Sequence, residues 1–164
     1  MITQVLPNIW IGDESASTSV KFFKQANITA VLNMTHDLEN VFHGEAEYMR
    51  IPVYDSEQKR DVSHMYSYVP AMTEFIYKNA VLEKKNVLVH CLQGKQRSAA
   101  AVAVYMIKYY KMTPTQVIDF LLDKKKDVFH HGKSVNFSPV INKWYRKMEK
   151  IRKQTDTSNL SVCV

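Results

Sequence analysis

Residues 86–98 read Asn86-Val87-Leu88-Val89-His90-Cys91-Leu92-Gln93-Gly94-Lys95-Gln96-Arg97-Ser98. The first five residues form a short run rich in β-branched side chains, which is typical of a buried strand. Helical character begins near Arg97, and residues 99–110 are apolar nearly all round, as in a buried helix. We therefore predict a strand, a tight loop and a buried helix in direct succession.

The loop between this strand and this helix has the composition of an anion-binding site. A loop that opens a helix combines backbone N–H groups with the positive end of the helix dipole, so it can hold a phosphate dianion. Cys91 lies at the base of the loop, where the same dipoles stabilise a thiolate. Gly94 permits backbone torsions that a side chain would forbid, and Arg97 can bind two phosphate oxygens with its planar guanidinium group. The other predicted phosphate-binding positions are Leu92, Gln93, Lys95 and Gln96.

Two residues beside the loop have predicted supporting roles. Ser98 can donate a hydroxyl hydrogen bond to the Cys91 sulfur when that sulfur departs from phosphate. His90 is not needed as a base, because a thiolate requires none, and we expect its side chain to hold the loop through hydrogen bonds. A buried cysteine at a strand end is commonly a small core residue. With this composition, however, chance would produce such a motif with odds on the order of 10⁻⁵, so we interpret Cys91 as a nucleophile.

Outward from the loop, apolar periodicity predicts an α/β domain. The predicted strands are residues 3–6, 9–12, 29–33, 48–53 and 86–90. The predicted helices are residues 15–25, a long helix that starts at and is capped by Asp61, then 97–110, 114–122 and 138–153. Thr113 and Pro114 supply an N-cap and a first-turn proline. We expect a central mixed, mostly parallel sheet of about five short strands flanked by helices, with the phosphate loop between the last strand and a buried helix.

The chain has 164 residues, 46% of them apolar and 23% charged, which is ordinary globular usage. We expect one domain over residues 1–153 and a flexible C-terminal tail over residues 154–164. The net charge of +6 comes from a basic surplus in residues 101–153. No nucleic-acid recognition motif accompanies that surplus, so we interpret it as solvated helix faces and expect no nucleic-acid partner.

Membrane, secretory and metal-dependent classes find no support in the sequence. The longest apolar run, residues 99–107, is far shorter than the ~20 residues of a membrane-spanning helix. No secretory signal is visible, so we expect an intracellular protein of the cytoplasm or nucleus. The two cysteines, Cys91 and Cys163, have neither disulfide nor zinc-site spacing, and we expect no metal and no cofactor. Cys163 does not fit a prenylation box and is expected to be inert.

The pattern His90-Cys91-X-X-Gly94-X-X-Arg97-Ser98 is the signature of the cysteine-dependent protein tyrosine phosphatases, and the chain resembles their compact dual-specificity branch over residues 5–150. The flanking segments that are similar to that branch are residues 6–12, 28–33, 51–55 with 61–63, and 134–137. In the last of these, Val135 replaces the usual proline. The resemblance implies that residues 1–153 are a phosphatase catalytic domain.

The resemblance also implies the reaction and the substrate class. A cofactor-free phosphatase of this branch hydrolyses phosphotyrosine and phosphoserine/threonine in proteins through a phosphocysteine, here on Cys91. A shallow pocket is expected, because 164 residues leave no room for the insertions that deepen the pocket of strict tyrosine phosphatases. Asp55 is the expected general acid, a role that contributes ~10²–10⁴-fold. Glu57 and Asp61 compete, but Glu57 is better explained as a solvated loop charge and Asp61 as a helix cap.

Some positions leave alternatives open. Asn33, at the end of its strand, either ties down the phosphate loop or forms a turn. Lys95 and Gln96 depart from the small residues that the family often has there. Lys95 resembles a residue of phosphoinositide-directed members, but Leu92 stands where their second loop lysine would be. The alternatives are therefore a phosphoinositide or RNA 5′-phosphate phosphatase, or a catalytically silent phosphate-binding scaffold.

Overall fold

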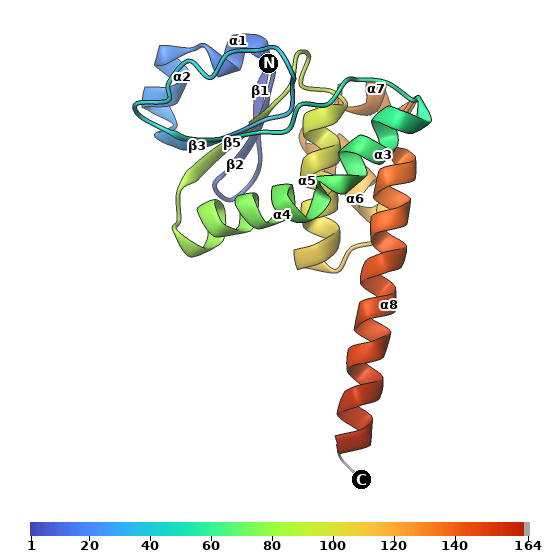
Figure 1. Cartoon of the computed structure of the whole chain (residues 1–164). Helices are drawn as coiled ribbons and strands as arrows, with labels where there is room; N and C mark the ends of the chain where they lie inside the picture. Colours follow the sequence, from blue (N-terminus) through green and yellow to red (C-terminus); the bar gives the residue numbers. More distant parts are fainter. Residues whose placement is uncertain (163–164) are drawn as a thin grey trace.

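Five short strands form one mixed sheet in the order β1-β2-β5-β3-β4 (Figure 1). Strands β1 and β2 are antiparallel, and every other neighbouring pair is parallel. The computed structural model describes the backbone of residues 1–162 and the side chains of residues 1–158. The strands are β1 (Ile2–Leu6), β2 (Ile9–Gly12), β3 (Ile28–Asn33), β4 (Glu47–Arg50) and β5 (Asn86–His90). The predicted mixed, mostly parallel sheet is therefore confirmed.

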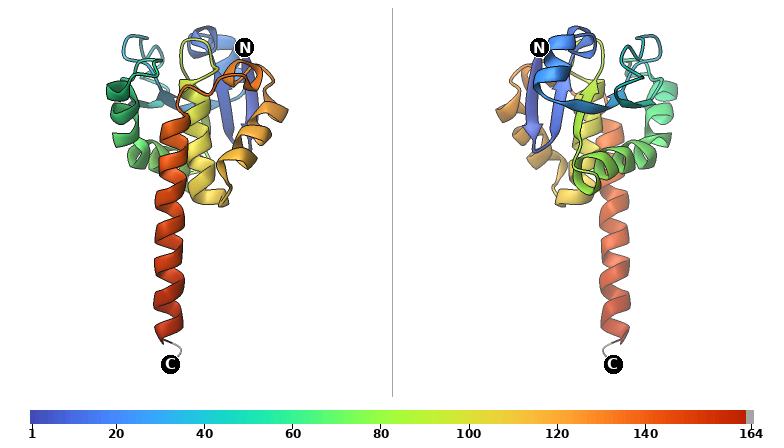
Figure 2. Two further views of the ribbon diagram at one scale, coloured as in Figure 1. Left: turned by 90° about the vertical axis from the view of Figure 1, so that its right-hand side faces the viewer. Right: turned by 90° about the vertical axis from the view of Figure 1, so that its left-hand side faces the viewer.

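Helices cover both faces of this sheet (Figures 1 and 2). On one face lie α1 (Glu14–Ser17) and α2 (Val20–Gln25), and α2 contributes Phe23 to a small apolar cluster that also includes Leu88. The main core lies on the other face, where alternate strand residues such as Leu32 and Val89 pack against the remaining helices. Those elements are α3 (Lys59–Ser67), α4 (Val69–Tyr77), the π-helix η1 (Lys78–Leu82), α5 (Arg97–Tyr110), α6 (Pro114–Lys124) and α8 (Ser138–Val162).

Helix α5 is the buried helix of the domain, as its sequence predicts. Its residues 97–107 are all buried. The Trp144 indole of α8 donates a hydrogen bond of 3.0 Å to the Val104 carbonyl oxygen. Helix α6 begins as predicted, because Thr113 and Gln116 form a reciprocal capping box with Pro114 in the first turn. The N-terminus of α5, where the phosphate loop ends, is thus fixed by a packed core.

Three predicted boundaries near the N-terminal half are wrong. The helix expected over residues 15–25 is two helices, because the Ser19 hydroxyl accepts a hydrogen bond from the Phe22 N–H and starts α2 anew. The strand expected over residues 48–53 ends at Arg50, since Pro52 has no N–H to extend the ladder. Asp61 is not a cap: it lies buried in the first turn of α3, whose N-cap is Gln58.

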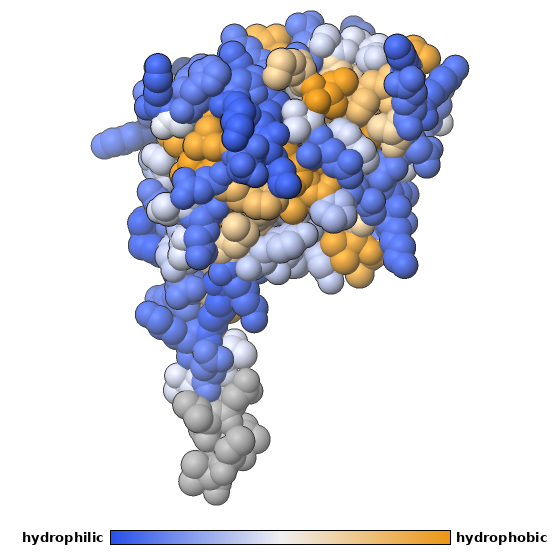
Figure 3. Space-filling view, turned by 180° about the vertical axis from the view of Figure 1, so that it is seen from behind, coloured by the Kyte–Doolittle hydropathy of each residue, from blue (hydrophilic) through white to orange (hydrophobic). Residues whose placement is uncertain are grey.

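The last helix is longer than predicted. Helix α8 continues beyond the expected end at Lys153 to Val162 and extends away from the rest of the molecule (Figures 1 and 2). Residues 154–162 contain no glycine or proline that would interrupt it, and the Thr155 hydroxyl donates to the Ile151 carbonyl one turn earlier. Residues 153–158 are exposed, and Figure 3 shows mostly hydrophilic residues along this part.

Helical backbone thus occupies most of the segment predicted as a flexible tail, residues 154–164. The expectation that Cys163 is inert concerns a residue that lies outside the described part of the chain. Within residues 1–162, no helix combines the length and apolar character that crossing a bilayer requires.

Candidate active site

Cys91 and Ser98 face each other across the loop that joins β5 to α5. The Cys91 Sγ lies 3.2 Å from the Ser98 Oγ, a distance suited to the predicted hydrogen bond. Cys91 is only 2% exposed and Ser98 is fully buried. The strand, tight loop and helix are arranged as the sequence predicts, so the thiol lies at the base of a loop that opens a helix.

The loop uses its carbonyl groups and leaves its N–H groups free. The carbonyl oxygens of Leu92 and Lys95 accept hydrogen bonds from the N–H groups of Glu14 (3.0 Å) and Phe129 (2.9 Å). By contrast, no backbone N–H of residues 92–97 donates a hydrogen bond to any part of the chain that the structure describes. Unpaired N–H groups at a helix N-terminus can bind an anion, because each is an unsatisfied donor and the helix dipole adds positive potential.

The guanidinium group of Arg97 connects the loop to the segment that carries Asp55. Its Nη1 donates a hydrogen bond of 3.0 Å to the Val53 carbonyl oxygen. Its Nε is buried and has no hydrogen-bond partner among residues 1–158. Arg97 therefore holds the Val53 backbone while it keeps a donor for a phosphate oxygen.

The loop packs tightly against the end of β2. Gly94 has a φ of +69°, and a Cβ there would lie 2.9 Å from the backbone carbon and oxygen of Gly12. No other residue type fits that approach without displacing the backbone. The position predicted to need a glycine is therefore one where both the torsion and the space require it.

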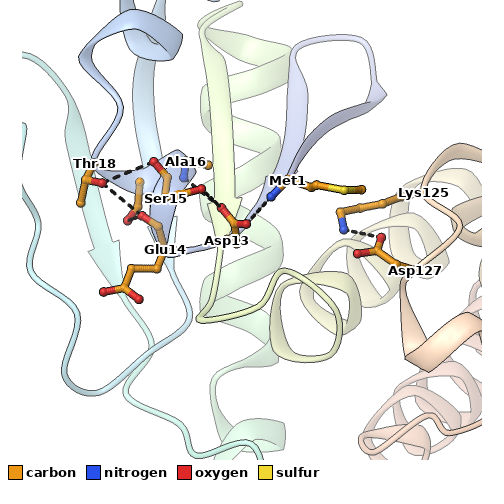
Figure 4. A network of polar contacts seen from close by, with 9 residues as sticks. Met1, Asp13, Glu14, Ser15, Ala16, Thr18, Lys125 and Asp127 are labelled. Carbon is orange, nitrogen blue, oxygen red and sulfur yellow. Dashed lines mark hydrogen bonds and ion pairs between the residues drawn. The ribbon is translucent and has the colours of Figure 1, made fainter.

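Asp13, next to Gly12, starts α1 behind the loop. Its carboxylate accepts hydrogen bonds from the Ala16 N–H and the Ser15 hydroxyl and pairs with the Met1 ammonium group (Figure 4). Partial burial acts to raise the pKa of Asp13, but these hydrogen bonds and the ammonium charge outweigh it and lower the pKa to about 2. The close view also shows the buried Lys125 ammonium paired with Asp127 at 2.6 Å.

The prediction for the His90 side chain is wrong. His90 is fully buried, and neither ring nitrogen makes a hydrogen bond to a residue that the structure describes. Burial, opposed by the Cys91 backbone and reinforced by the charges of Arg50 and Arg97, lowers the pKa of His90 to about 4. The backbone of His90 does the anchoring instead, since its carbonyl oxygen accepts a 2.9 Å hydrogen bond from the Met34 N–H.

Of the two roles considered for Asn33, the structure matches the turn. The Asn33 Nδ2 donates to the Leu38 carbonyl (2.9 Å) and to Asn40 Oδ1 (2.8 Å). Its Oδ1 accepts from the N–H and the hydroxyl of Thr35. All these partners lie in the connection after β3, so the buried Asn33 side chain does not reach the phosphate loop.

Asp55 is exposed and lies on an irregular segment between β4 and α3. Its Oδ1 accepts a hydrogen bond of 3.0 Å from the Asn136 Nδ2. Of the two competing carboxyls, Glu57 is exposed in the same segment and Asp61 is buried in α3. Of the three carboxyls, Asp55 is the nearest in sequence to Val53, whose carbonyl oxygen accepts the Arg97 hydrogen bond.

Gln96 has a role that the sequence analysis missed. It is only 2% exposed, and its Nε2 donates to the Ser134 carbonyl (2.7 Å) while its Oε1 accepts from the Asn136 N–H (3.1 Å). The polar atoms of its side chain therefore bind the backbone of residues 134–136, and only its backbone N–H is available to phosphate. The feature of the sequence that could have indicated this role is the size of Gln96, because a long amide side chain occupies a position where the family often has a small residue.

The segment α7 (Phe129–Gly132), which touches the loop through Phe129, is a left-handed turn. The φ angles are +53° for Phe129, +49° for His130, +60° for His131 and +79° for Gly132. Three consecutive non-glycine residues in this region are strained, at about 1–2 kcal/mol each. Such strain persists only where the surroundings hold it, and it clusters at functional sites.

Comparisons with known proteins agree with this geometry. Residues 9–147 match the family model described as dual specificity phosphatase, catalytic domain. The chain is 25% identical over 162 residues to the protein phosphatase Slingshot of Drosophila melanogaster, which covers 96% of this chain and 15% of that protein. It is 30% identical over 127 residues to dual specificity protein phosphatase 7 of Homo sapiens, with coverage of 76% and 29%. The chain therefore spans less than a third of the length of either relative.

The fold is also similar to solved structures. The crystal structure of DUSP15 superposes with a TM-score of 0.78 and covers 95% of each chain, at 19% sequence identity. At this identity the likeness shows the fold, namely a mixed sheet of short strands between helices. It agrees with the fold class predicted from the strand, loop and helix of residues 86–110.

Proposed function

Because the chain belongs to the dual specificity phosphatase family, we propose that it hydrolyses phosphate monoesters on proteins through a phosphocysteine on Cys91. One observation carries the proposal: the thiol lies at the base of a loop whose N–H groups, from residue 92 to residue 97, have no partner in the described part of the chain. Those donors and the free Nε of Arg97 match the oxygens of a phosphate group.

In the first half of the reaction, the Cys91 thiolate attacks phosphorus. The S–P bond forms, the P–O bond to the substrate side chain breaks, and the leaving oxygen takes a proton from Asp55. The loop N–H groups and Arg97 stabilise the charge on the equatorial oxygens. Free tyrosine, serine or threonine side chains leave, and Cys91 carries the phosphoryl group.

In the second half, water attacks the phosphocysteine. The Asp55 carboxylate accepts the proton of that water, the S–P bond breaks, and inorganic phosphate leaves. The sulfur departs as a thiolate, and the Ser98 hydroxyl, 3.2 Å away, donates a hydrogen bond that stabilises it. Atoms and charges return to the starting state without a cofactor.

Phosphorylated proteins are the proposed substrates, with both phosphotyrosine and phosphothreonine accepted. The half-exposed side chain of Leu92 lies at the loop itself, which fits a shallow entrance. Phosphoinositides or RNA 5′-phosphates are the second candidate, favoured only by Lys95 and the basic surplus. A silent scaffold is the third, and the presence of Cys91, Arg97 and Asp55 together argues against it.

The test is turnover of phosphotyrosine and phosphothreonine peptides beside inositol phospholipids and triphosphate-ended RNA, with Cys91→Ser as the background. We expect both peptides to be hydrolysed, the phosphotyrosine peptide faster because its longer aryl ester reaches deeper. Cys91→Ser should lose turnover but still bind inorganic phosphate, since the cradle is backbone and Arg97. Turnover that survives in Cys91→Ser excludes the covalent mechanism, and preference for lipid or RNA selects the second candidate.

A further inference from the structure

The amide group of Gln96 joins the phosphate loop to the segment 134–136. Both of its polar atoms are used there, on the Ser134 carbonyl at 2.7 Å and on the Asn136 N–H at 3.1 Å. The Gln96 side chain is almost completely buried and both bonds are partly buried, which reduces competition from water. The Asn136 backbone is therefore fixed relative to the loop that would hold phosphate.

The side chain of Asn136 is oriented by a second contact. The Ser134 hydroxyl donates a hydrogen bond of 3.0 Å to Asn136 Oδ1. The Nδ2 of the same amide is left to donate to Asp55 Oδ1, also at 3.0 Å. Because a hydroxyl donor occupies the oxygen end of the amide, the nitrogen end is the one that faces Asp55.

The same segment is attached to the loop at another point. The Phe129 N–H donates to the Lys95 carbonyl, and the buried side chains of Phe129 and Phe137 lie before and after residues 134–136. The left-handed turn of residues 129–132 separates the two attachments. Neighbouring loop residues, Lys95 and Gln96, thus hold both ends of one short connection.

We propose that Gln96 and Asn136 form a positioning bridge that sets where the Asp55 carboxyl lies relative to the phosphate loop. Asp55 is exposed on an irregular segment, so its own backbone provides little constraint on its side chain. A general acid must be within hydrogen-bond reach of the leaving oxygen, and small misplacements are costly. Because the bridge is attached to the phosphate loop, it fixes the distance between the Asp55 carboxyl and the leaving oxygen of a phosphate bound there.

The bridge also selects which oxygen carries the proton. A carboxylic acid accepts the Asn136 Nδ2–H more strongly at its carbonyl oxygen than at the oxygen that carries the proton. Because Oδ1 is engaged by that donor, the contact favours the acid form whose proton lies on Oδ2, and this is the oxygen we assign to the leaving group. Asn136 is a positioning residue, because it acts on substrate through Asp55. This inference rests on the proposed role of Asp55 as the general acid.

The test compares a phosphotyrosine peptide with an activated aryl phosphate, whose leaving group barely needs a proton. We expect Asn136→Ala to lower kcat on the peptide by roughly tenfold to a hundredfold, the size of a small misplacement, and to spare the activated ester and KM. Asn136→Asp keeps the shape of the side chain but removes the donor, and we expect the same selective loss. Asn142→Ala, the same change at an exposed position of α8, is the matched control for which neither rate should move.

Gln96→Ala tests the other end of the bridge. Because Gln96 belongs to the phosphate loop, its replacement can change both substrates, so the ratio of the two rates is the measure. We expect that ratio to shift against the phosphotyrosine peptide, as in Asn136→Ala. An unchanged ratio in both Gln96→Ala and Asn136→Ala, or equal slowing of both esters, overturns the bridge.

A double-mutant cycle separates the failure of this inference from the failure of the proposed acid. If Asn136 acts only through Asp55, adding Asn136→Ala to Asp55→Asn causes no further loss on the peptide. A full additional loss means that Asn136 acts elsewhere and refutes the bridge alone. If Asp55→Asn itself slows both esters equally, Asp55 is not the acid, and the proposed function and the bridge fall together.

Discussion

The Arg97 Nη1 donates a hydrogen bond of 3.0 Å to the backbone carbonyl of Val53, two residues before Asp55. One guanidinium group thus contacts the segment of the proposed acid and keeps its buried Nε for the proposed phosphate. With the contact between Asn136 and Asp55, this segment is held from two sides.

Replacing Arg97 by lysine should impair both tasks. A lysine ammonium is a point charge that cannot bond the Val53 carbonyl and two phosphate oxygens in one plane. We expect kcat/KM on a phosphotyrosine peptide to fall by roughly 10²–10³-fold, the usual cost of losing a preorganised donor. Steady-state kinetics and a thermal midpoint measure the two effects, and kinetics like those of the wild type would mean that Arg97 is only structural.

Replacing Asp55 by asparagine should slow only reactions that need a proton on the leaving oxygen. We expect a loss of ~10²–10⁴-fold on phosphotyrosine and a much smaller loss on an activated aryl phosphate. The alkaline limb of the pH–rate profile should flatten in the same variant, while the acidic limb persists.

Glu57→Gln is the control for Asp55→Asn, because it removes a carboxylate from the same exposed segment. It should leave both substrates and the pH profile nearly unchanged. If Glu57→Gln or Asp61→Asn removes the alkaline limb and Asp55→Asn does not, the proton comes from a different carboxyl.

The buried His90 should make the fold sensitive to mild acid. Its pKa falls from 6.5 to about 4 on folding, so the unfolded chain binds more protons between these values. Above about pH 6.5, protonation of His90 does not change the free energy of unfolding. As the pH falls from 6.5 toward 4, that free energy decreases by a total on the order of 3 kcal/mol. Urea unfolding at pH 7, 6 and 5 measures the slope.

Of the six histidines in the chain, only His90 is buried. His90→Gln, which does not titrate, should therefore flatten the dependence even if its overall stability is lower. A wild-type slope retained in His90→Gln would assign the effect to carboxyl groups instead.

The left-handed turn predicts a stabilising substitution. His131 is exposed and has a φ of +60°, so His131→Gly removes backbone strain and few contacts. We expect a gain of about 0.5–1 kcal/mol, since the strain relieved exceeds the added entropy of the unfolded chain. His64→Gly, the same change at an exposed position of α3, should instead cost about 1 kcal/mol. Thermal or urea unfolding of the pair would show opposite signs.

Local patterns predicted the sheet and the loop well. A run such as residues 86–90 reads as a strand because its side chains are β-branched and apolar, and the signature at residues 90–98 assigns a chemical use to each type of residue. Thr113 and Pro114 correctly predicted the start of a helix, because capping depends only on residues that are close in the sequence.

Contacts between residues that are distant in the sequence account for part of what local patterns did not predict. Gln96 meets Ser134 and Asn136, and no periodicity in the sequence connects those positions. His90 was expected to hold the loop through side-chain hydrogen bonds, but the fold buries its ring without partners in the described chain. The end of α8 was misplaced because no glycine or proline marks it.

The two parts of helix α8 differ in the contacts that protect their backbone N–H groups from exchange with solvent. Up to Arg152, whose guanidinium donates to the Ile107 carbonyl, the helix is braced by the body of the protein. From Lys153 to Thr157 every residue is exposed, and the hydrogen bonds described for this stretch run along the helix itself. Short unsupported helical stretches are marginal in water. Hydrogen–deuterium exchange along this one helix should therefore show a step near Arg152, with slow exchange before it set by global unfolding and fast exchange after it set by local opening.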